Sequence, residues 1–182
     1  MHFQTIKHWN DEIWDQVSVI YFQAFENGAK PEHIIKNMFT KKICVFHLLY
    51  NGSDLLAFAL SSSLQQSKVL IIDYIGVKIG ERNNGTGTML LNYIKQWVKE
   101  NSSIKYIIIE VEAAQTTSNL ERIAFWKKND FILTDYVHHY KWVPESYRSM
   151  YYKLVTNASD IKNGEQLFSY ITSFHKESFS KK

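Results

Sequence analysis

The chain has 182 residues, of which 45% are hydrophobic and 15% aromatic, enough for one domain with a sizeable core and short for two. Its net charge is +3 and its lysines are scattered, so nucleic acid is a weak candidate for a partner. A small anionic ligand is equally compatible with this mildly basic charge. The single cysteine, Cys44, excludes an intrachain disulfide framework and any multi-cysteine zinc site, and we interpret it as a small apolar strand residue.

The N-terminal stretch MHFQTIKHWNDE lacks the continuous apolar core of a signal peptide. A run of about 18 apolar residues, which a membrane-spanning helix needs, does not occur in the sequence. We therefore expect a soluble, cytoplasmic protein without a membrane partner.

Helical signals come first in the chain, after a short candidate strand at 2–6. Asn10 can cap a helix that begins at Asp11, and apolar residues then recur at helical spacing. Gly28 suits the end of this helix, and Pro31 fits the first turn of a second one.

The pattern then changes to β-rich runs separated by turn residues. Runs at 42–50, 55–63 and 68–77 predict an antiparallel meander. The glycine-rich turn RNNGTG at 82–87 follows, and an apolar-faced helix comes directly after it.

The second half of the chain continues with strands and one helix. The run at 105–112 predicts a mostly buried strand, and Ser118 and Glu121 have the spacing of a capping box that opens a helix. FILTDYV and SMYYKLV predict further strands, joined by a loop rich in Tyr, His and Trp.

The tail from 157 predicts a terminal helix packed on the domain or on a partner. Its residues at helical spacing are Leu167, Phe168, Ile171, Phe174 and His175. We therefore predict one α+β domain over 1–156, with helices flanking a mixed, mostly antiparallel sheet, and a C-terminal helical extension over 157–182.

The turn RNNGTG has the features of an anion site. A strand that runs into a glycine-rich turn and then a helix directs several N–H groups and the helix dipole at one point, which suits phosphate. Gly85 and Gly87 let the backbone approach oxygens that a Cβ would block. Thr86 and Thr88 can add hydroxyl donors, and Arg82 can pair with a charged oxygen or brace the loop.

Two common phosphate-binding schemes fit poorly here. A P-loop has Gly-Lys-Ser/Thr after its second glycine, whereas Thr88 and Met89 follow Gly87. The dinucleotide fingerprint has a third glycine where Leu90 stands, and it expects a parallel βαβ unit rather than a turn after three β-rich runs.

A third scheme fits the turn. Arg-x-x-Gly-x-Gly after a strand that ends in valine resembles motif A of the GNAT superfamily of N-acetyltransferases, in which the loop holds the pyrophosphate of acetyl-coenzyme A. The matching residues are Val77, Arg82, Gly85 and Gly87.

A second match lies downstream, where members of the family often carry Asn-x-x-Ala-x-x-x-Tyr-x-x-x-Gly-Phe, varied in detail. The corresponding stretch here contains Asn119, Ile123, Ala124, Trp126 and Phe131. The order of elements also resembles the family over roughly 3–155, and the tail from 157 lies outside the resemblance.

The resemblance implies a three-layer GNAT-like fold and acetyl-CoA as co-substrate. It implies that the cofactor-binding residues are Gly76, Val77, Arg82, Asn83, Asn84, Gly85, Thr86, Gly87, Thr88, Asn119 and Trp126. Backbone N–H groups around Gly76 and Val77 would polarise the thioester carbonyl, and the acetyl group would pass directly to an amine.

Two positions depart from the family pattern. Trp126 replaces the tyrosine that often protonates the departing thiolate, and an indole N–H serves only as a hydrogen-bond donor, although the ring can still pack against the pantetheine arm. Asp130 stands where the family has glycine.

Asp73 and Glu110 are the candidate catalytic residues, because relatives often carry an acid near the substrate at the position of Asp73. A carboxylate inside an otherwise apolar strand is costly unless it is paired or solvated, and capping loops or pairing with lysines remains the alternative for both. Strand alternation predicts that Tyr74 lies on the opposite face from Ile71, Asp73, Ile75 and Val77.

Replacement proton donors for the missing tyrosine come from the aromatic second half of the chain. The candidates are Tyr136, Tyr140 and Tyr151, with His138 and His139 nearby in the sequence. The paired histidines lack a carboxylate or third ligand at a convincing spacing, so we expect no metal.

The acceptor is the least defined part of the prediction. In this fold the first two helices, the loop between them at 25–33 and the loop at 136–147 usually wall the acceptor site. Their composition suits a small amine, an amino acid or a peptide N-terminus equally, and the alternative for the aromatic loop is the edge of the core. The alternative is an acyl-CoA sensor or scaffold without turnover, which Trp126 and the apolar tail motivate. The tail is also a candidate for homodimerisation.

Overall fold

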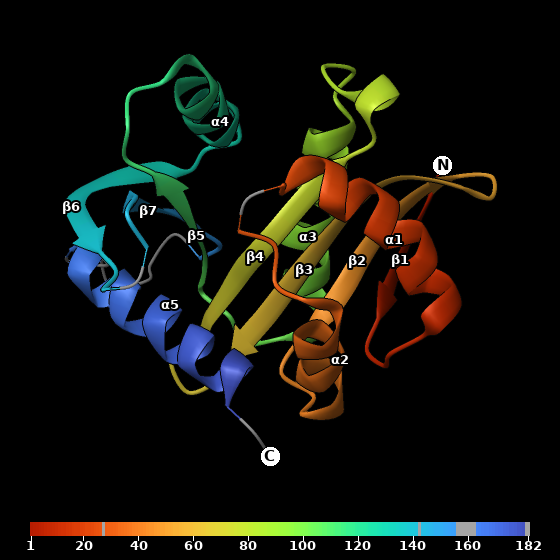
Figure 1. Ribbon diagram of the computed structural model, residues 1–182, viewed down its shortest axis with the longest axis horizontal. Coiled ribbons are helices and arrows are strands. Elements are labelled where there is room, and N and C mark those ends of the chain that lie inside the picture. The colour runs from red at the N-terminus through yellow and green to blue at the C-terminus, as the bar shows by residue number, and fades with distance from the viewer. Residues whose placement is uncertain (27, 142, 156–162, 181–182) are drawn as a thin grey trace.

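The computed structural model describes residues 1–26, 28–141, 143–155 and 163–180, which form a seven-stranded mixed sheet with helices on both faces (Figure 1). The strands are β1 (His2–Ile6), β2 (Val45–Asn51), β3 (Asp54–Leu64), β4 (Val69–Val77), β5 (Tyr106–Glu112), β6 (Ile132–His139) and β7 (Ser146–Lys153). The helices are α1 (Asp11–Ala24), α2 (Glu32–Thr40), the short 3-10 helix η1 (Ile79–Glu81), α3 (Thr86–Asn101), α4 (Thr117–Lys128) and α5 (Gly164–Phe179). The predicted α+β class, the mixed sheet and the C-terminal helix are confirmed.

The sheet order is β1-β2-β3-β4-β5-β7-β6, and neighbouring strands are antiparallel except for β4 and β5. These two central strands run parallel and pair only where Val69–Ile71 lies beside Tyr106–Ile108. Beyond that point they diverge, as Figure 1 shows, so the sheet opens at its centre.

Helices cover both faces of the sheet and bury two apolar clusters. The cluster shared with α1, α2 and α5 includes Trp14, Val17, Met38, Phe58, Phe168 and Phe174. The cluster shared with α3 and α4 includes Leu90, Leu91, Ile94, Ile107, Trp126 and Met150. Because both faces are covered, β3 and β4 are mostly buried, and each begins its buried part with a continuous apolar run, at 55–60 and 69–72, rather than an alternation with polar residues.

The helix starts depend on local capping, and two of the expected helix ends are wrong. Asn10 Oδ1 accepts from the Ile13 N–H at 2.9 Å, which confirms the predicted cap of α1. α1 ends at Ala24, before Gly28, because the chain already leaves helical geometry at Phe25. α4 is capped by Thr116 rather than by Ser118: the Thr116 hydroxyl accepts from the Asn119 N–H at 3.2 Å.

The predicted division of β4 into two faces is also wrong, because the strand contains a β-bulge. Leu60 pairs with Tyr74 and the adjacent Ser61 pairs with Ile72, so Asp73 is an extra residue in β4. A bulge interrupts the alternation of side chains. Tyr74 therefore packs in the same cluster as Ile71, whereas Ile75 and Val77 contact the opposite cluster.

The C-terminal helix packs on the domain itself. The predicted boundary at 156–157 lies outside the described residues, and α5 begins after Asn163, whose Oδ1 accepts from the Gln166 N–H at 2.9 Å. Its buried side chains join the cluster of α1 and α2; they include Leu167, Phe168, Ile171 and Phe174.

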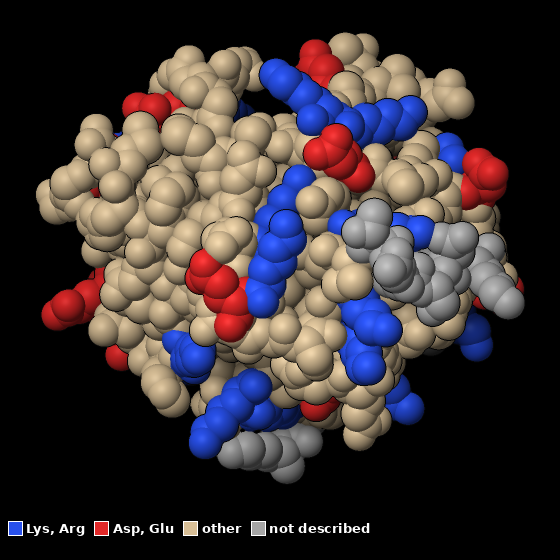
Figure 2. Space-filling view, turned by 180° about the vertical axis from the view of Figure 1, so that it is seen from behind, with Lys and Arg blue, Asp and Glu red and all other residues tan. Residues whose placement is uncertain are grey.

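Positive and negative side chains both occur on the face opposite to that of Figure 1. There Lys and Arg are interspersed with Asp, Glu and uncharged side chains (Figure 2). Among the helices that the described residues form, none combines the length and apolar character needed to cross a membrane.

Candidate active site

A cleft of about 940 Å³ lies where β4 and β5 diverge, between the start of α3 and α4. The sequence-predicted residues that line it are Asp73, Gly76, Val77, Arg82, Asn83, Gly85, Thr86, Gly87, Thr88, Glu110 and Trp126. The cleft therefore joins the glycine-rich turn to both candidate catalytic carboxylates. Asn84 and Asn119 are not among the described residues that line it.

The N-terminus of α3 faces this cleft without a side-chain cap. Gly85 is the N-cap residue, with φ of +81° and ψ of −2°, and no side chain accepts a hydrogen bond from the first turn. α2 also lacks a side-chain cap, whereas Asn or Thr side chains cap α1, α4 and α5. The first-turn amides of a helix have no acceptor within the helix, and the helix dipole is positive there. This end of α3 can therefore receive an anion.

The two glycines of the turn serve different purposes. A Cβ on Gly85 would meet no atom within 4 Å, so the residue is constrained by its positive φ and leaves open space in front of it. A Cβ on Gly87 would lie 3.3 Å from Cε2 of Phe125 in α4. Gly87 thus allows α3 and α4 to approach closely.

Other turn residues brace the loop or lie within it. Arg82 Nε donates to the Val77 carbonyl at 3.2 Å, which is the bracing role considered from the sequence. The Thr86 side chain is buried, whereas Thr88 is half-buried. Asn83 has a left-handed backbone conformation, with φ of +66°.

The downstream pattern shapes the far wall of the cleft. Asn119 is buried, and its Nδ2 donates at 3.0 Å to Glu112 Oε2 and to the Ala114 carbonyl, so it ties the end of β5 to the start of α4. Trp126 is buried beside two other rings, 5.2 Å from Phe125 and 4.8 Å from Phe131 between centroids.

Asp73 pairs with a lysine, which is the alternative considered from the sequence, although the sequence did not indicate that the partner is Lys30. Lys30 Nζ lies 2.8 Å from Asp73 Oδ1 and 2.7 Å from Oδ2, and the two side chains are only 4% and 5% exposed. Lys30 comes from the loop between α1 and α2, where its N–H donates to the Tyr21 hydroxyl at 2.7 Å. A lysine in a loop normally lies in solvent, so no local signal marks this one.

Glu110 lies across the opening from Asp73 and is not paired with a lysine among the contacts that the described residues make. The Tyr140 hydroxyl donates to Glu110 Oε2 at 2.8 Å. Burial raises the pKa of Glu110 to about 7, although the Tyr140 hydrogen bond opposes this rise. A carboxyl group with such a pKa can accept a proton near neutral pH.

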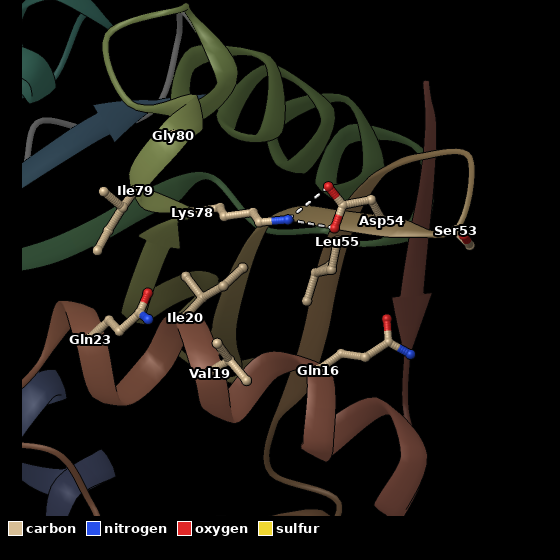
Figure 3. A pocket seen from close by; sticks show the side chains of 10 residues that line it. All are labelled: Gln16, Val19, Ile20, Gln23, Ser53, Asp54, Leu55, Lys78, Ile79 and Gly80. Carbon is tan, nitrogen blue, oxygen red and sulfur yellow. Dashed lines mark hydrogen bonds and ion pairs between the residues drawn. The ribbon is translucent and has the colours of Figure 1, made fainter.

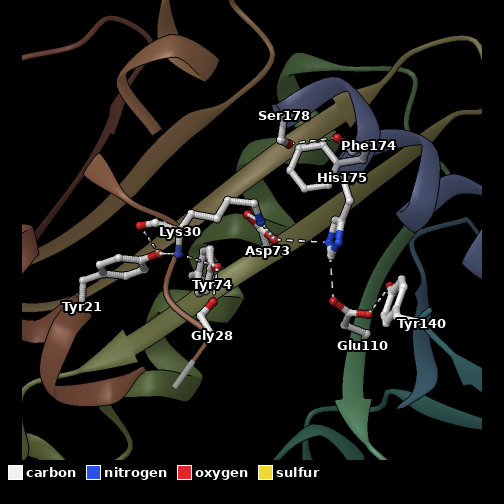
Figure 4. Close-up of polar contacts among 10 residues, drawn as sticks. All are labelled: Tyr21, Gly28, Lys30, Asp73, Tyr74, Glu110, Tyr140, Phe174, His175 and Ser178. Atoms are coloured by element: carbon white, nitrogen blue, oxygen red, sulfur yellow. Dashed lines mark hydrogen bonds and ion pairs between the residues drawn. The ribbon is translucent and has the colours of Figure 1, made fainter. Parts of the chain in front are cut away.

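His175 of α5 lies between the two carboxylates (Figure 4). Its Nε2 is 3.5 Å from Glu110 Oε1 and 3.7 Å from Asp73 Oδ1. Burial and, secondarily, the Lys30 charge lower the pKa of His175 to about 4, so the imidazole is neutral at neutral pH. The sequence placed His175 on the terminal helix but gave it no role in the site.

The tyrosines considered as replacement acids have different surroundings. Tyr136 lies against Phe168 of α5, with 5.8 Å between ring centroids, and Tyr151 packs against the same cluster. Tyr147, which the sequence analysis did not single out, lines the cleft. Burial, and then the charge of Glu110, raise the pKa of Tyr147 to about 12, so its hydroxyl keeps its proton.

Two further features of the molecule concern metal ligands and a second cavity. In the described ranges, no three His, Cys, Asp or Glu side chains converge as metal ligands. A smaller cavity of about 450 Å³ lies between α1 and the chain around η1 (Figure 3). An exposed ion pair forms part of its wall, with Lys78 Nζ 2.7 Å from Asp54 Oδ1.

The comparison with protein families agrees with this fold and cleft. The model of the acetyltransferase (GNAT) family matches residues 6–131, and the chain therefore belongs to that family. No curated protein sequence matches the chain.

Solved structures with similar folds include N-acetyltransferases. The ribosomal-protein-S18-alanine N-acetyltransferase from Escherichia coli is 12% identical, with a TM-score of 0.65 over 88% of this chain and 99% of that one. An aminoglycoside 6'-N-acetyltransferase complexed with coenzyme A is 14% identical, with a TM-score of 0.68 over 87% and 100% of the two chains. An acetyltransferase from Bacillus subtilis in complex with CoA is 16% identical, with a TM-score of 0.59 over 85% and 99%.

Proposed function

We propose that this protein is an N-acetyltransferase that moves the acetyl group of acetyl-CoA directly to a primary amine of a small molecule, amino acid or peptide. The observation that carries the proposal is the single cleft that joins the uncapped start of α3 to the carboxylates of β4 and β5. Two relatives of similar fold were solved with coenzyme A, which supports the choice of co-substrate.

The chain's own residues fit such a co-substrate. The open space before Gly85 and the first-turn amides of α3 suit its diphosphate. Beyond Ile71, β4 no longer pairs with β5. Backbone N–H groups around Gly76 and Val77 on that edge of β4 can therefore donate to the thioester carbonyl. Trp126 lines the cleft, where it can contact the pantetheine arm. When bound, acetyl-CoA supplies the acyl group that is transferred.

Glu110 is the better candidate for the general base. Both oxygens of Asp73 are engaged by Lys30, whereas Glu110 has a pKa raised to about 7 by burial and lines the cleft. Glu110 takes a proton from the amine, whose nitrogen bonds to the acyl carbon while the carbon–sulfur bond breaks. Tyr147 is a candidate donor of the proton that the departing thiolate needs. Asp73 keeps the buried Lys30 charge neutralised.

A panel of amines with a thiol-release readout tests this function. Wild-type protein should release thiol from acetyl-CoA faster with at least one amine, and Glu110→Gln should remove that stimulation while retaining acetyl-CoA binding. Binding without stimulation by any amine class would exclude the transferase in favour of the second candidate.

The second candidate is an acyl-CoA-binding sensor or scaffold without turnover. The buried indole of Trp126 favours it, because this ring occupies a position where relatives often carry an acidic hydroxyl. Mass spectrometry of the amine products separates the two candidates, since a sensor forms none.

A further inference from the structure

The C-terminal helix α5 joins the two halves of the opened sheet (Figure 1). At its C-terminal end, Asn37 Nδ2 donates to the Ser180 carbonyl at 3.3 Å and Lys41 Nζ donates to the Glu177 carbonyl at 2.8 Å. At its other end, the Phe168 ring stacks on His138 of β6, with centroids 4.4 Å apart. The helix therefore crosses the sheet close to the point where β4 and β5 separate.

His175 of this helix lies beside the residues that follow the last pair of β4 and β5. Asp73 and Glu110 each follow the final pair, Ile71 and Ile108, by two residues. Beyond this pair the strands have no mutual hydrogen bonds to fix their separation. The Nε2 of His175, at 3.5 and 3.7 Å from the two carboxylates, is the group from α5 that links them (Figure 4).

Glu110 is contacted on both of its carboxylate oxygens. Tyr140 donates to Oε2 at 2.8 Å, and His175 Nε2 lies nearest to Oε1. The rings of Tyr140 and His175 are themselves stacked, 6.0 Å apart and 10° from parallel. Two stacked rings therefore lie beside the two oxygens of this carboxylate.

The groups around Glu110 and His175 determine the protonation state of the His175 ring. The titratable and charged groups that face Glu110 are Lys30, Asp73, Tyr140, Tyr147 and His175. Protonation of His175 is opposed by burial and by the Lys30 charge, so the ring is neutral. A neutral imidazole has one N–H, and with Nε2 facing two carboxylates the tautomer that donates from Nε2 is favoured. Both distances are longer than the usual N–H···O hydrogen bond, and Glu110 Oε1 is the nearer of the two acceptors.

We propose that His175 is a positioning residue of the active site: its Nε2–H, which lies nearest to Glu110 Oε1, donates to the Glu110 carboxylate and holds it in the orientation that faces the cleft. This role rests on the proposed function of Glu110 as the base. The competing role is packing, because the ring also lies beside Phe174, 5.6 Å away. The two roles predict opposite rankings for two substitutions.

His175→Phe keeps an aromatic ring and the burial of Glu110 but removes the N–H donor, whereas His175→Gln keeps an N–H donor and loses the ring. A hydrogen bond to the ionised carboxylate lowers its pKa, so the Phe variant should raise the pKa of Glu110 by about one pH unit. The Gln variant should leave it close to the wild-type value. Ser173→Gln, on the exposed side of α5, is the matched control and should behave as wild type.

Two readouts are needed so that this inference and the proposed function can fail separately. The first is the Glu110 carboxyl titration by carbon-13 NMR on the free protein, which needs no turnover. The second is the pH profile of kcat/KM, in which the Phe variant should be about tenfold slower than wild type below pH 6 because the acidic limb moves upward.

The inference is overturned if the Phe variant titrates like wild type, or if the Gln variant shifts as far as the Phe variant. The expected rise in the Glu110 pKa of the Phe variant, together with no turnover in any variant, would instead sink the proposed function and retain the role of His175 at Glu110. Thermal unfolding of each variant checks that α5 remains folded.

Discussion

Lys30 Nζ lies within 2.8 Å of both carboxylate oxygens of Asp73, although the two residues are 43 positions apart in the sequence. Both side chains are almost wholly withdrawn from water. Removing one partner from such a pair leaves the other charge buried and uncompensated, which costs more than the pair contributes. The pair therefore fixes the loop between α1 and α2 against β4.

We expect Asp73→Asn to lower the free energy of unfolding by about 3–5 kcal/mol, because Lys30 then carries an unpaired buried charge. Lys30→Met should have a similar effect, and the double variant should recover part of the loss. Urea unfolding monitored by circular dichroism measures all three.

An exposed ion pair of the same geometry provides the control for this experiment. Lys78 Nζ lies 2.7 and 2.8 Å from the two oxygens of Asp54, with side chains 45% and 57% exposed. Asp54→Asn should cost at most about 1 kcal/mol, because water screens the pair. Equal losses at Asp54 and Asp73 would contradict the argument from burial.

Gly85→Asp should abolish binding of acetyl-CoA. The residue has a positive φ that side chains rarely adopt, and its carboxylate would project where the diphosphate is proposed to lie. Isothermal titration calorimetry measures the loss. Gly52→Asp imposes the same backbone strain in the β2–β3 turn, also in open space, and should leave binding unchanged. Undiminished binding by the Gly85 variant would place the diphosphate elsewhere.

The pH dependence of turnover should report on Glu110. Because burial raises its pKa to about 7, the carboxylate that accepts the amine proton is lost as the pH falls through 7, and kcat/KM should decline on that side. Glu110→Gln should lower kcat by about 10²–10⁴-fold and flatten this limb. Stopped-flow detection of released thiol between pH 5.5 and 9 tests both outcomes. An unchanged acidic limb in the Gln variant would assign the proton acceptor to another group.

Acid should destabilise the protein through His47 of β2. This side chain is fully buried between Thr5 Oγ1 at 3.0 Å and Ser61 Oγ at 2.9 Å, and burial lowers its pKa to about 3. The unfolded chain binds a proton below its ordinary pKa of 6.5, whereas the folded chain does not until near pH 3. The stability that the neutral His47 contributes is therefore fully present above pH 6.5, and it is lost as the pH falls from 6.5 to about 3.

At pH 4.5 this linkage should amount to about 2–3 kcal/mol relative to neutral pH. His47→Gln has no titrating imidazole, so its stability relative to wild type should rise as the pH is lowered. Guanidinium unfolding at pH 7 and pH 4.5 measures the difference, with the exposed His8→Gln as control. A pH-independent difference between wild type and the His47 variant would show that His47 can be protonated in the folded state.

The elements and the glycine-rich turn follow from local signals in the sequence. Helical periodicity predicts α1 and α5, and the Asn10 cap has the expected hydrogen bond. The errors are also local: Thr116 rather than Ser118 caps α4, and the bulge at Asp73 reverses the expected faces of β4. A bulge depends on the register with β3, which strand alternation alone cannot show.

The sequence by itself determined the family, the glycine-rich turn and the identity of two carboxylates inside apolar strands, because periodicity, turn chemistry and the expense of a buried charge can be read from neighbouring residues. Only the tertiary structure decided which groups surround those carboxylates. Lys30 reaches Asp73 from one loop, while Tyr140 and His175 reach Glu110 from two other segments. The charge state of a buried acid depends on the groups that folding brings around it, and those groups are distant in the chain.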